Sequence, residues 1–242
     1  MVKNLEFDIH HVVRTSSTQD AVRDAALRGA APGYCVVADE QTAGRGRLGR
    51  RWVSPPGTSL LASVLLRPQA TLEGIPFVAG LAAIDALRRE CRLEAQLKWP
   101  NDVLLEGRKL AGVLVEGISR SGAAAPLVIV GLGMNLMVRA FPDDVSAVSL
   151  DQLVARAPDR DRVLSAWLGA LTTRLSQLAD DGLAALLADW RCHAWGLGQP
   201  ATVTTPAGIY AGVAVDVDDT GALVLRTHSG IQRVVAGDLT VS

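Results

Sequence analysis

The chain has 242 residues, enough for one substantial hydrophobic core and a small additional unit. Its formal net charge of -1 gives no overall attraction to DNA or RNA, and its three scattered cysteines suit neither a disulfide framework nor a zinc site. The N-terminal sequence is typical of neither a signal peptide nor a transit segment, and no apolar run has membrane-spanning length, so we expect a cytoplasmic protein without membrane contact.

Hydrophobic periodicity predicts that most of the chain is α+β. One helix begins where Ser17 or Thr18 can cap it, and apolar residues recur at helical spacing in segments 73–91 and 160–190. Apolar runs of strand length lie at residues 34–38, 60–66, 94–99, 102–118 with a turn at Glu106 and Gly107, and 126–133. We expect these strands to form one mixed β-sheet flanked by helices.

The sequence pattern changes abruptly after Trp195. Residues 196–242 read as short alternating strands joined by turns that contain Gly, Asp and Pro. This change predicts two domains, a larger ligand-binding domain over 1–195 and a small β-barrel over 196–242.

A loop at residues 43–52, "AGRGRLGRRW", combines glycine spacing typical of dinucleotide binding with four arginines. In a Rossmann fold such glycines lead directly into a helix, whereas Pro55 and Pro56 prevent a helix here. The loop is therefore no dinucleotide fingerprint. Because alternating glycine and arginine gives flexibility and anion affinity together, we expect a lid that is mobile when empty and becomes ordered over an anionic ligand.

Two lysines lie among polar residues that interrupt the apolar strands. In "KWPND", Lys98, Asn101 and Asp102 project from a tight turn, although the last two also suit a simple turn. Strict alternation along the next strand places Lys109 on the same face as Ala111, Val113 and Val115. An ammonium on an apolar face needs an anionic partner, unless Lys109 is an exposed hairpin lysine.

Glycines and amides complete the set of candidate site residues. Gly131 and Gly133 leave room for a ligand beside Asn135, or else mark a bulge. No P-loop, nucleophile elbow or metal-binding helix motif is present in the sequence. Together with the amides of Gln19 and Gln41, these features suit a phosphate-bearing ligand that is held by positioning and electrostatics, without a protein nucleophile.

These motifs, in this order, resemble those of the biotin protein ligases. The likeness rests on five segments: "STQ" at 17–19, "GRGRLGRRW" at 44–52, "KWPND" at 98–102, "RKLAGVLVE" at 108–116 and "GLGMN" at 131–135. With the β-strand tail it covers nearly the whole chain. The resemblance implies a mixed-sheet catalytic domain of the class II synthetase-like kind, followed by an SH3-like β-barrel.

The resemblance also implies a two-step reaction at one site, with biotin, ATP and Mg²⁺. The carboxylate of biotin attacks the α-phosphorus of MgATP, which gives biotinyl-5'-adenylate and pyrophosphate. The amine of one lysine on a biotin carboxyl carrier domain of an acyl-CoA carboxylase then attacks this mixed anhydride.

On this interpretation Lys109 and Arg47 are the catalytic residues, because they neutralise charge that develops at the α-phosphate. Biotin is expected to contact Ser17, Thr18, Gln19, Gln41, Arg45, Gly46, Arg47, Lys109 and Gly112. The nucleotide is expected to contact Gly44, Arg47, Trp52, Lys98, Asn101, Asp102, Gly131 and Asn135, with Trp52 packed on the adenine. The ligands of the magnesium ion stay unassigned.

Two departures from the family pattern and two alternatives stay open. Gln19 stands where the family has asparagine, and the longer amide is expected to shift the contacts with biotin. Only sixteen residues precede Ser17, too few for a winged-helix domain, so we expect no specific DNA binding and no repressor function. The alternatives are a lipoate or octanoyl ligase of related fold and a non-enzymatic nucleic-acid-binding module. Either a monomer or a weak homodimer is compatible with the sequence.

Overall fold

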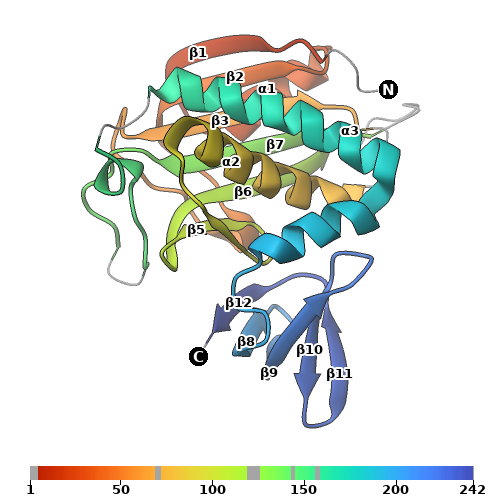
Figure 1. The fold of residues 1–242 in the computed structure, drawn as a ribbon. Coiled ribbons are helices and arrows are strands. Elements are labelled where there is room, and N and C mark those ends of the chain that lie inside the picture. Colours follow the sequence, from red (N-terminus) through yellow and green to blue (C-terminus); the bar gives the residue numbers. More distant parts are fainter. Residues whose placement is uncertain (1–4, 69–71, 119–125, 143–144, 156–158, 242) are drawn as a thin grey trace.

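A seven-stranded mixed sheet forms the centre of the protein. The computed structural model describes residues 5–68, 72–118, 126–142, 145–155 and 159–241. The strand order is β1-β2-β3-β7-β6-β5-β4, with β1 and β2 parallel and the other neighbours antiparallel (Figure 1). The strands are β1 (Asp8–Thr15), β2 (Tyr34–Gln41), β3 (Ser59–Leu66), β4 (Gln96–Lys98), β5 (Asp102–Leu105), β6 (Arg108–Ile118) and β7 (Leu127–Asn135).

Helices cover the two faces of this sheet unequally. Helices α2 (Ile75–Cys91) and α3 (Arg160–His193) lie side by side across one face, as Figure 1 shows. Helix α1 (Thr18–Leu27) packs on part of the opposite face, where Val22 and Ala26 contact an apolar cluster that includes Leu65 of β3. The rest of that second face carries the candidate site.

Side-chain alternation along β3 and β7 separates the main core from the site. On β7, Val128, Val130, Leu132 and Met134 point toward α2 and α3 and belong to the main core. The intervening positions after Ile129 are Gly131, Gly133 and Asn135, and they face the other way. The candidate site therefore shares its strands with the core.

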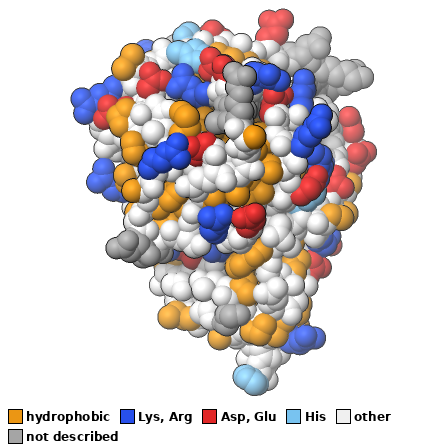
Figure 2. Space-filling model, turned by 60° about the vertical axis from the view of Figure 1, so that its left-hand side comes forward, with side chains coloured by type: hydrophobic (Ala, Val, Ile, Leu, Met, Phe, Trp, Pro, Cys, Tyr) orange, Lys and Arg blue, Asp and Glu red, His pale blue; other side chains and the backbone are white. Residues whose placement is uncertain are grey.

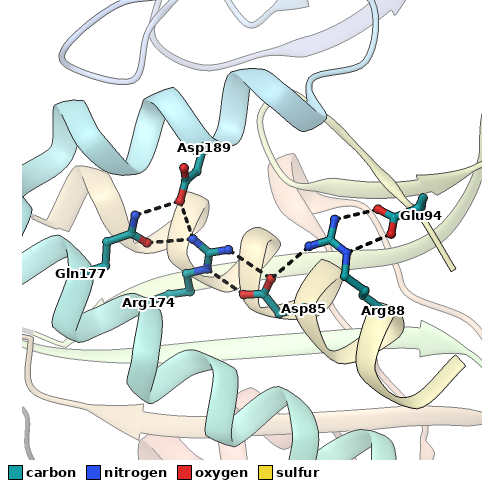
Figure 3. A network of polar contacts seen from close by, with 6 residues as sticks. All are labelled: Asp85, Arg88, Glu94, Arg174, Gln177 and Asp189. Atoms are coloured by element: carbon teal, nitrogen blue, oxygen red, sulfur yellow. Dashed lines mark hydrogen bonds and ion pairs between the residues drawn. The ribbon is translucent and has the colours of Figure 1, made fainter. Parts of the chain in front are cut away.

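Helix α3 is broken, contrary to the continuous helix expected from the sequence. Gly182 has a φ of 82°, a left-handed conformation that glycine adopts at little cost, and it divides the helix into two parts. Arg174 of the first part bonds Asp189 of the second at 2.7 Å and Asp85 of α2 at 2.7 Å (Figure 3). The polar network of Figure 3 thus links both parts of α3 to α2.

A second sheet of five antiparallel strands follows α3 at one end of the molecule (Figure 1). Its strands are β8 (Pro200–Thr205), β9 (Gly208–Val217), β10 (Leu223–Thr227), β11 (Gly230–Val234) and β12 (Asp238–Val241), in the order β11-β10-β9-β8-β12. Among the described strands, no pairing joins β11 to β12 to close a barrel. The mixed sheet, its helices and this C-terminal sheet confirm the predicted fold class, whereas the domain boundary at residue 196 stays a prediction.

Two local features differ from the sequence-based expectations. Strand β1 was not predicted, because it lies at the sheet edge and its mostly exposed residues show no apolar alternation. The hydroxyl of Ser17 occupies the N-cap position of α1 but makes no capping hydrogen bond. In the part of the chain that the structure describes, no helix is long and apolar enough to cross a membrane.

Candidate active site

The candidate site is centred on glycines of β6 and β7, against which two protein side chains lie. A Cβ atom added at Gly133 would be 2.7 Å from Cε2 of Trp52, and one at Gly112 would be 3.3 Å from Cζ3 of the same indole. A Cβ atom at Gly131 would be 3.3 Å from Cδ of Gln19. The glycines are needed because these side chains approach the backbone closely.

The start of α1 is held in place by the side chain of Gln41, from strand β2. Oε1 of Gln41 accepts hydrogen bonds from the backbone N–H of Thr18 at 2.7 Å and from its Oγ1 at 3.1 Å. The Thr18 hydroxyl also bonds Oγ of Ser63, on β3, at 2.8 Å. Gln41 therefore caps the helix, the role that the sequence suggested for Ser17 or Thr18.

Several buried polar atoms of this region have no hydrogen-bond partner among the described residues. They are Ser17 Oγ, Gln19 Oε1, Ser59 Oγ, Trp52 Nε1 and Arg45 Nε. The amide of Gln19 donates from Nε2 to the carbonyl of Leu114 at 3.0 Å, so only its oxygen is left without a partner. Buried polar groups without partners are uncommon, and a cluster of them indicates a place where a polar ligand binds.

The arginine-rich segment, here called the arginine loop (residues 44–52), forms a compact hairpin. The backbones of Arg45 and Arg51 pair in an isolated antiparallel β-bridge. The N–H of Gly46 donates to the Arg50 carbonyl at 2.8 Å, and the N–H of Trp52 donates to the Gly44 carbonyl at 3.0 Å. This hairpin places Trp52 over Gly133. The structure therefore describes the loop in a closed arrangement, while its expected mobility stays a prediction.

The arginines of this loop differ in their charge partners. Arg45 pairs with Glu116 at 2.7 Å and with Asp20 at 2.9 Å, so carboxylates already neutralise it. Arg47 instead donates to two neutral acceptors, Oδ1 of Asn101 at 3.3 Å and the Gly237 carbonyl at 3.2 Å. Burial lowers the pKa of Arg47, an effect opposed by the charges of Asp238 and Asp102. Arg47 is the better placed of the two to bind an anion.

Lys109 lies on the site face, contrary to the strict alternation expected from the sequence. The register between β5 and β6 shifts so that Leu104 pairs with Lys109 and Val103 with Ala111. This bulge turns Lys109 to the side of Gly112, whose added Cβ atom would be 3.5 Å from the ammonium. The expected anionic partner is present, since Nζ of Lys109 lies 2.7 Å from Oδ1 of Asp102.

The turn before β5 brings a second lysine to the same region. Lys98 lies 5.7 Å from the ring centre of Trp195, and burial lowers its pKa, opposed mainly by Asp102. Asn101 donates from Nδ2 to the Val113 carbonyl at 2.7 Å while it accepts from Arg47. The turn is thus linked both to β6 and to the arginine loop.

Asn135 supports Lys109 through the backbone. Its Nδ2 lies within hydrogen-bonding distance of the carbonyls of Lys109, at 3.4 Å, and Val148, at 3.3 Å. The Lys109 backbone is bonded in addition to Ser146 and Val148. Asn135 is 4% exposed, so this amide is mainly occupied by the protein itself.

The described residues do not form a preassembled metal site. No group of three or more His, Cys, Asp or Glu side chains with metal-binding geometry is found in the described ranges. A magnesium ion that enters with a nucleotide needs only one or two protein carboxylates, because the phosphates and waters supply the other ligands. Asp102 can supply one carboxylate oxygen in addition to the one that binds Lys109.

Sequence reasoning missed several residues that hold the site together. Ser63 forms a hydrogen bond with Thr18. The carboxylates of Asp20 and Glu116 hold Arg45, and Asp238 pairs with Arg50 at 2.7 Å. Glu116 could have been found, because it ends the "RKLAGVLVE" segment. Asp238 lies far along the chain in an ordinary strand sequence, and no signal identifies it.

Comparisons with known proteins show which family of proteins the chain resembles. Residues 12–135 match the biotin/lipoate A/B protein ligase family, and residues 196–239 match the biotin protein ligase C terminal domain. The chain is 38% identical to a biotin--[acetyl-CoA-carboxylase] ligase of Paracoccus denitrificans over 94% of this chain and 98% of the relative. It is 36% identical to the Mycobacterium tuberculosis protein of the same name, over 94% of this chain and 86% of the relative.

A solved structure extends the likeness to the fold. The biotin protein ligase from Aquifex aeolicus in complex with biotin and ATP is 28% identical, with a TM-score of 0.84 over 97% of this chain and 98% of that one. The family match spans more than half of the chain, and it includes every expected site residue from Ser17 to Asn135. The chain belongs to the biotin/lipoate A/B protein ligase family.

Proposed function

We propose that the chain is an ATP-dependent biotin protein ligase. Biotin and MgATP react to give biotinyl-5'-adenylate and pyrophosphate, and a carrier lysine then attacks the adenylate to give an amide and AMP. The proposal extends to this chain what the names and titles of its relatives state of those proteins.

One observation carries this proposal. A single sheet face combines glycines that let Trp52 and Gln19 lie directly on the backbone, buried polar atoms without partners among the described residues, and half-buried cations. An unpaired buried donor or acceptor costs about 1–3 kcal/mol, so a ligand that pairs with these atoms is favoured. The neutral ureido ring of biotin suits the hydroxyl and amide atoms, whereas its carboxylate and the phosphates suit the cations.

The residues at the start of α1 would bind the ring of biotin. Ser17 Oγ and Gln19 Oε1 are the unpaired atoms available for this purpose. Thr18 and Gln41 bond each other, so their main contribution would be to hold the start of the helix in place. Arg45, Gly46 and Gly112 would border the chain that leads to the carboxylate.

Arg47 and Lys109 would promote the adenylation step. Two anions, the carboxylate and the α-phosphate, must approach each other while charge builds on the phosphoryl oxygens. An ammonium has three donors, and the bond from Lys109 to Asp102 leaves two for the reacting groups. Among the described residues the Arg47 guanidinium donates to neutral oxygens, so it can bind a phosphate without losing an ion pair there.

The nucleotide would lie between the arginine loop and the turn before β5. Trp52 would pack against the adenine, beside the backbone at Gly44 and Gly131, and Lys98 would face the phosphates. Asn101 and Asn135 would act chiefly by holding Arg47 and Lys109, because their amides already make these contacts. Asp102 is the residue that fits a magnesium ion, which would screen the phosphate charge when bound.

The second substrate would be a biotin carboxyl carrier domain, the class of protein implied by the names of the relatives. We further propose that the reaction takes place in the cytoplasm. We also propose that the protein does not bind DNA in a sequence-specific way. Basic and acidic side chains are interspersed on the face drawn in Figure 2, rather than gathered into one basic stripe.

Exchange of radioactive pyrophosphate into ATP tests the proposal directly. We expect exchange that depends on biotin, because adenylate formation is reversible. Lipoate and octanoate tested in place of biotin separate the related ligases, and the match of residues 196–239 to the biotin protein ligase C terminal domain favours biotin. Exchange with lipoate alone would support the alternative activity, and no exchange with any of the acids would contradict an adenylating enzyme.

A further inference from the structure

The arginine loop contacts the C-terminal sheet at two adjacent residues. Nη2 of Arg50 lies 2.7 Å from Oδ2 of Asp238, and Nη1 of Arg47 lies 3.2 Å from the carbonyl oxygen of Gly237. Gly237 immediately precedes β12, and Asp238 is the first residue of that strand. The loop that closes the candidate site is therefore held partly by a sheet that supplies none of the expected ligand contacts.

The C-terminal sheet is fixed firmly enough to hold this loop. Nε1 of the fully buried Trp99 donates to the Gly221 carbonyl at 3.1 Å, and Arg191 of α3 pairs with Asp216 at 2.6 Å. A Cβ atom added at Gly237 would be 2.6 Å from Cγ1 of Val203, so this segment packs tightly on β8. The acceptors for Arg47 and Arg50 thus have a defined position.

The opposite end of the loop is held by the central sheet. Arg45 pairs with Glu116 of β6 and with Asp20 of α1. Arg47, which we expect at the α-phosphate, lies between these contacts and the Arg50 pair. Release of either end would let the hairpin open and carry Trp52 away from Gly133.

We propose that Asp238 is a positioning residue that holds the arginine loop closed through Arg50, and so keeps the activated intermediate in the site until the carrier arrives. This inference rests on the proposed biotin ligase function. Asp238 touches no reacting atom; it acts on the position of Arg47 and Trp52.

The size of the expected effect follows from exposure. The side chain of Arg50 is 68% exposed and that of Asp238 is 26% exposed, so solvent screens their attraction. Loss of such a pair is expected to speed opening of the loop, and with it escape of the intermediate, by about two- to fivefold. Escaped biotinyl-5'-adenylate then reacts with water to give biotin and AMP.

A double-mutant cycle tests this role. Asp238→Asn, Arg50→Gln and the double variant are loaded with biotinyl-5'-adenylate without carrier, and the rate of its release is measured for each. Asp219→Asn is the matched control, because it removes the same charge from an exposed residue in the turn between β9 and β10 of the same sheet. Arg50→Gln lies on an exposed part of the loop and tests the pair even if a change at Asp238 disturbs folding.

We expect release to be about two- to fivefold faster in both single variants, no faster still in the double variant, and unchanged in the control. Additive effects of the two single variants, or equal release rates for Asp238→Asn and Asp219→Asn, would overturn the role of Asp238 and leave the proposed function standing. If the unaltered chain formed no adenylate, the proposed function would fall together with this inference.

Discussion

The two faces of the central sheet are built from the same strands for different purposes. Along β7, Leu132 and Met134 fill the core beneath α2 and α3, whereas Gly131 and Gly133 on the other face let Gln19 and Trp52 lie directly on the backbone. The core face gains stability from close apolar packing. The site face gives up that packing and contains buried polar atoms without partners. Stability and ligand binding are therefore separated by single-residue alternation, and substitutions on one strand can distinguish them.

Replacement of Lys109 by alanine is expected to have the largest effect on catalysis. The ammonium would help most where charge builds in the transition state, so adenylate formation should slow by about 10²- to 10³-fold. Biotin affinity should change little, because the ring can still occupy its place near Ser17. Single-turnover adenylate formation and calorimetric biotin binding are the measurements, and Lys109→Gln serves as the control that keeps a donor. A near-normal rate of adenylate formation would show that Lys109 has another role.

Replacement of Gly133 by valine is expected to slow adenylate formation by about 10²-fold. The new Cβ atom would overlap the Trp52 indole, which must move, and small displacements in a catalytic site have effects of this size. Valine suits a strand, so the free energy of unfolding should not fall for backbone reasons.

The matched control is Leu132→Ala, on the opposite face of the same strand. It should lower the free energy of unfolding by about 2–5 kcal/mol, because it leaves a cavity in the core, while the folded variant keeps its activity. Urea denaturation and adenylate formation are measured for both variants. The same loss of activity in both would contradict the division of labour between the two faces.

Lys98 provides a test of the same division by pH. Burial lowers its pKa below the ordinary value of 10.5, so the charged side chain destabilises the folded state at neutral pH. This penalty is complete below the pKa in the folded state and disappears as the pH rises through that pKa toward 10.5. Lys98→Met should therefore unfold at higher urea concentration at neutral pH, with a gain that shrinks at alkaline pH, and should lose at least about tenfold in adenylate formation. A gain that grows with pH would refute this interpretation.

Ligand-dependent protection of the arginine loop is expected to be smaller than the effects of Lys109→Ala and Gly133→Val. Its three glycines favour an open loop, and Arg47, which donates to neutral oxygens, gains a charged partner when an anion binds. Amide hydrogen exchange in residues 44–52 should slow by about tenfold with biotinyl-5'-adenylate, whereas exchange in α2 should not change. Equal exchange of the loop with and without ligand would remove the lid from the mechanism.

The sequence predicted the fold class well because the signals are local. Apolar periodicity identified α1, α2 and the central strands, and the Glu106–Gly107 turn joins β5 and β6 as expected. It failed where the determining contact is distant or depends on register. The bulge that turns Lys109 to the site face involves pairing with β5, and strict alternation cannot detect it.

The same limit applies to the candidate site. Short motifs located Lys98, Asn101, Lys109 and Asn135 near one another, and the structure brings them together around β5 and β6. The contact of Gly237 with Arg47 joins residues 190 positions apart, and the contact of Asp238 with Arg50 joins the neighbouring pair. Such pairs depend on how the two sheets pack, which no local pattern encodes.

The capping of α1 by Gln41 affects how this protein folds. The bond from Thr18 N–H to Gln41 spans 23 positions, so the helix lacks its cap until β2 has docked beside it. A ten-residue helix is marginal in water on its own, since nucleation is costly and most of its stability comes from tertiary packing. Helix α1 should consequently form late and together with the sheet, and a peptide that contains only residues 17–29 should be largely unfolded.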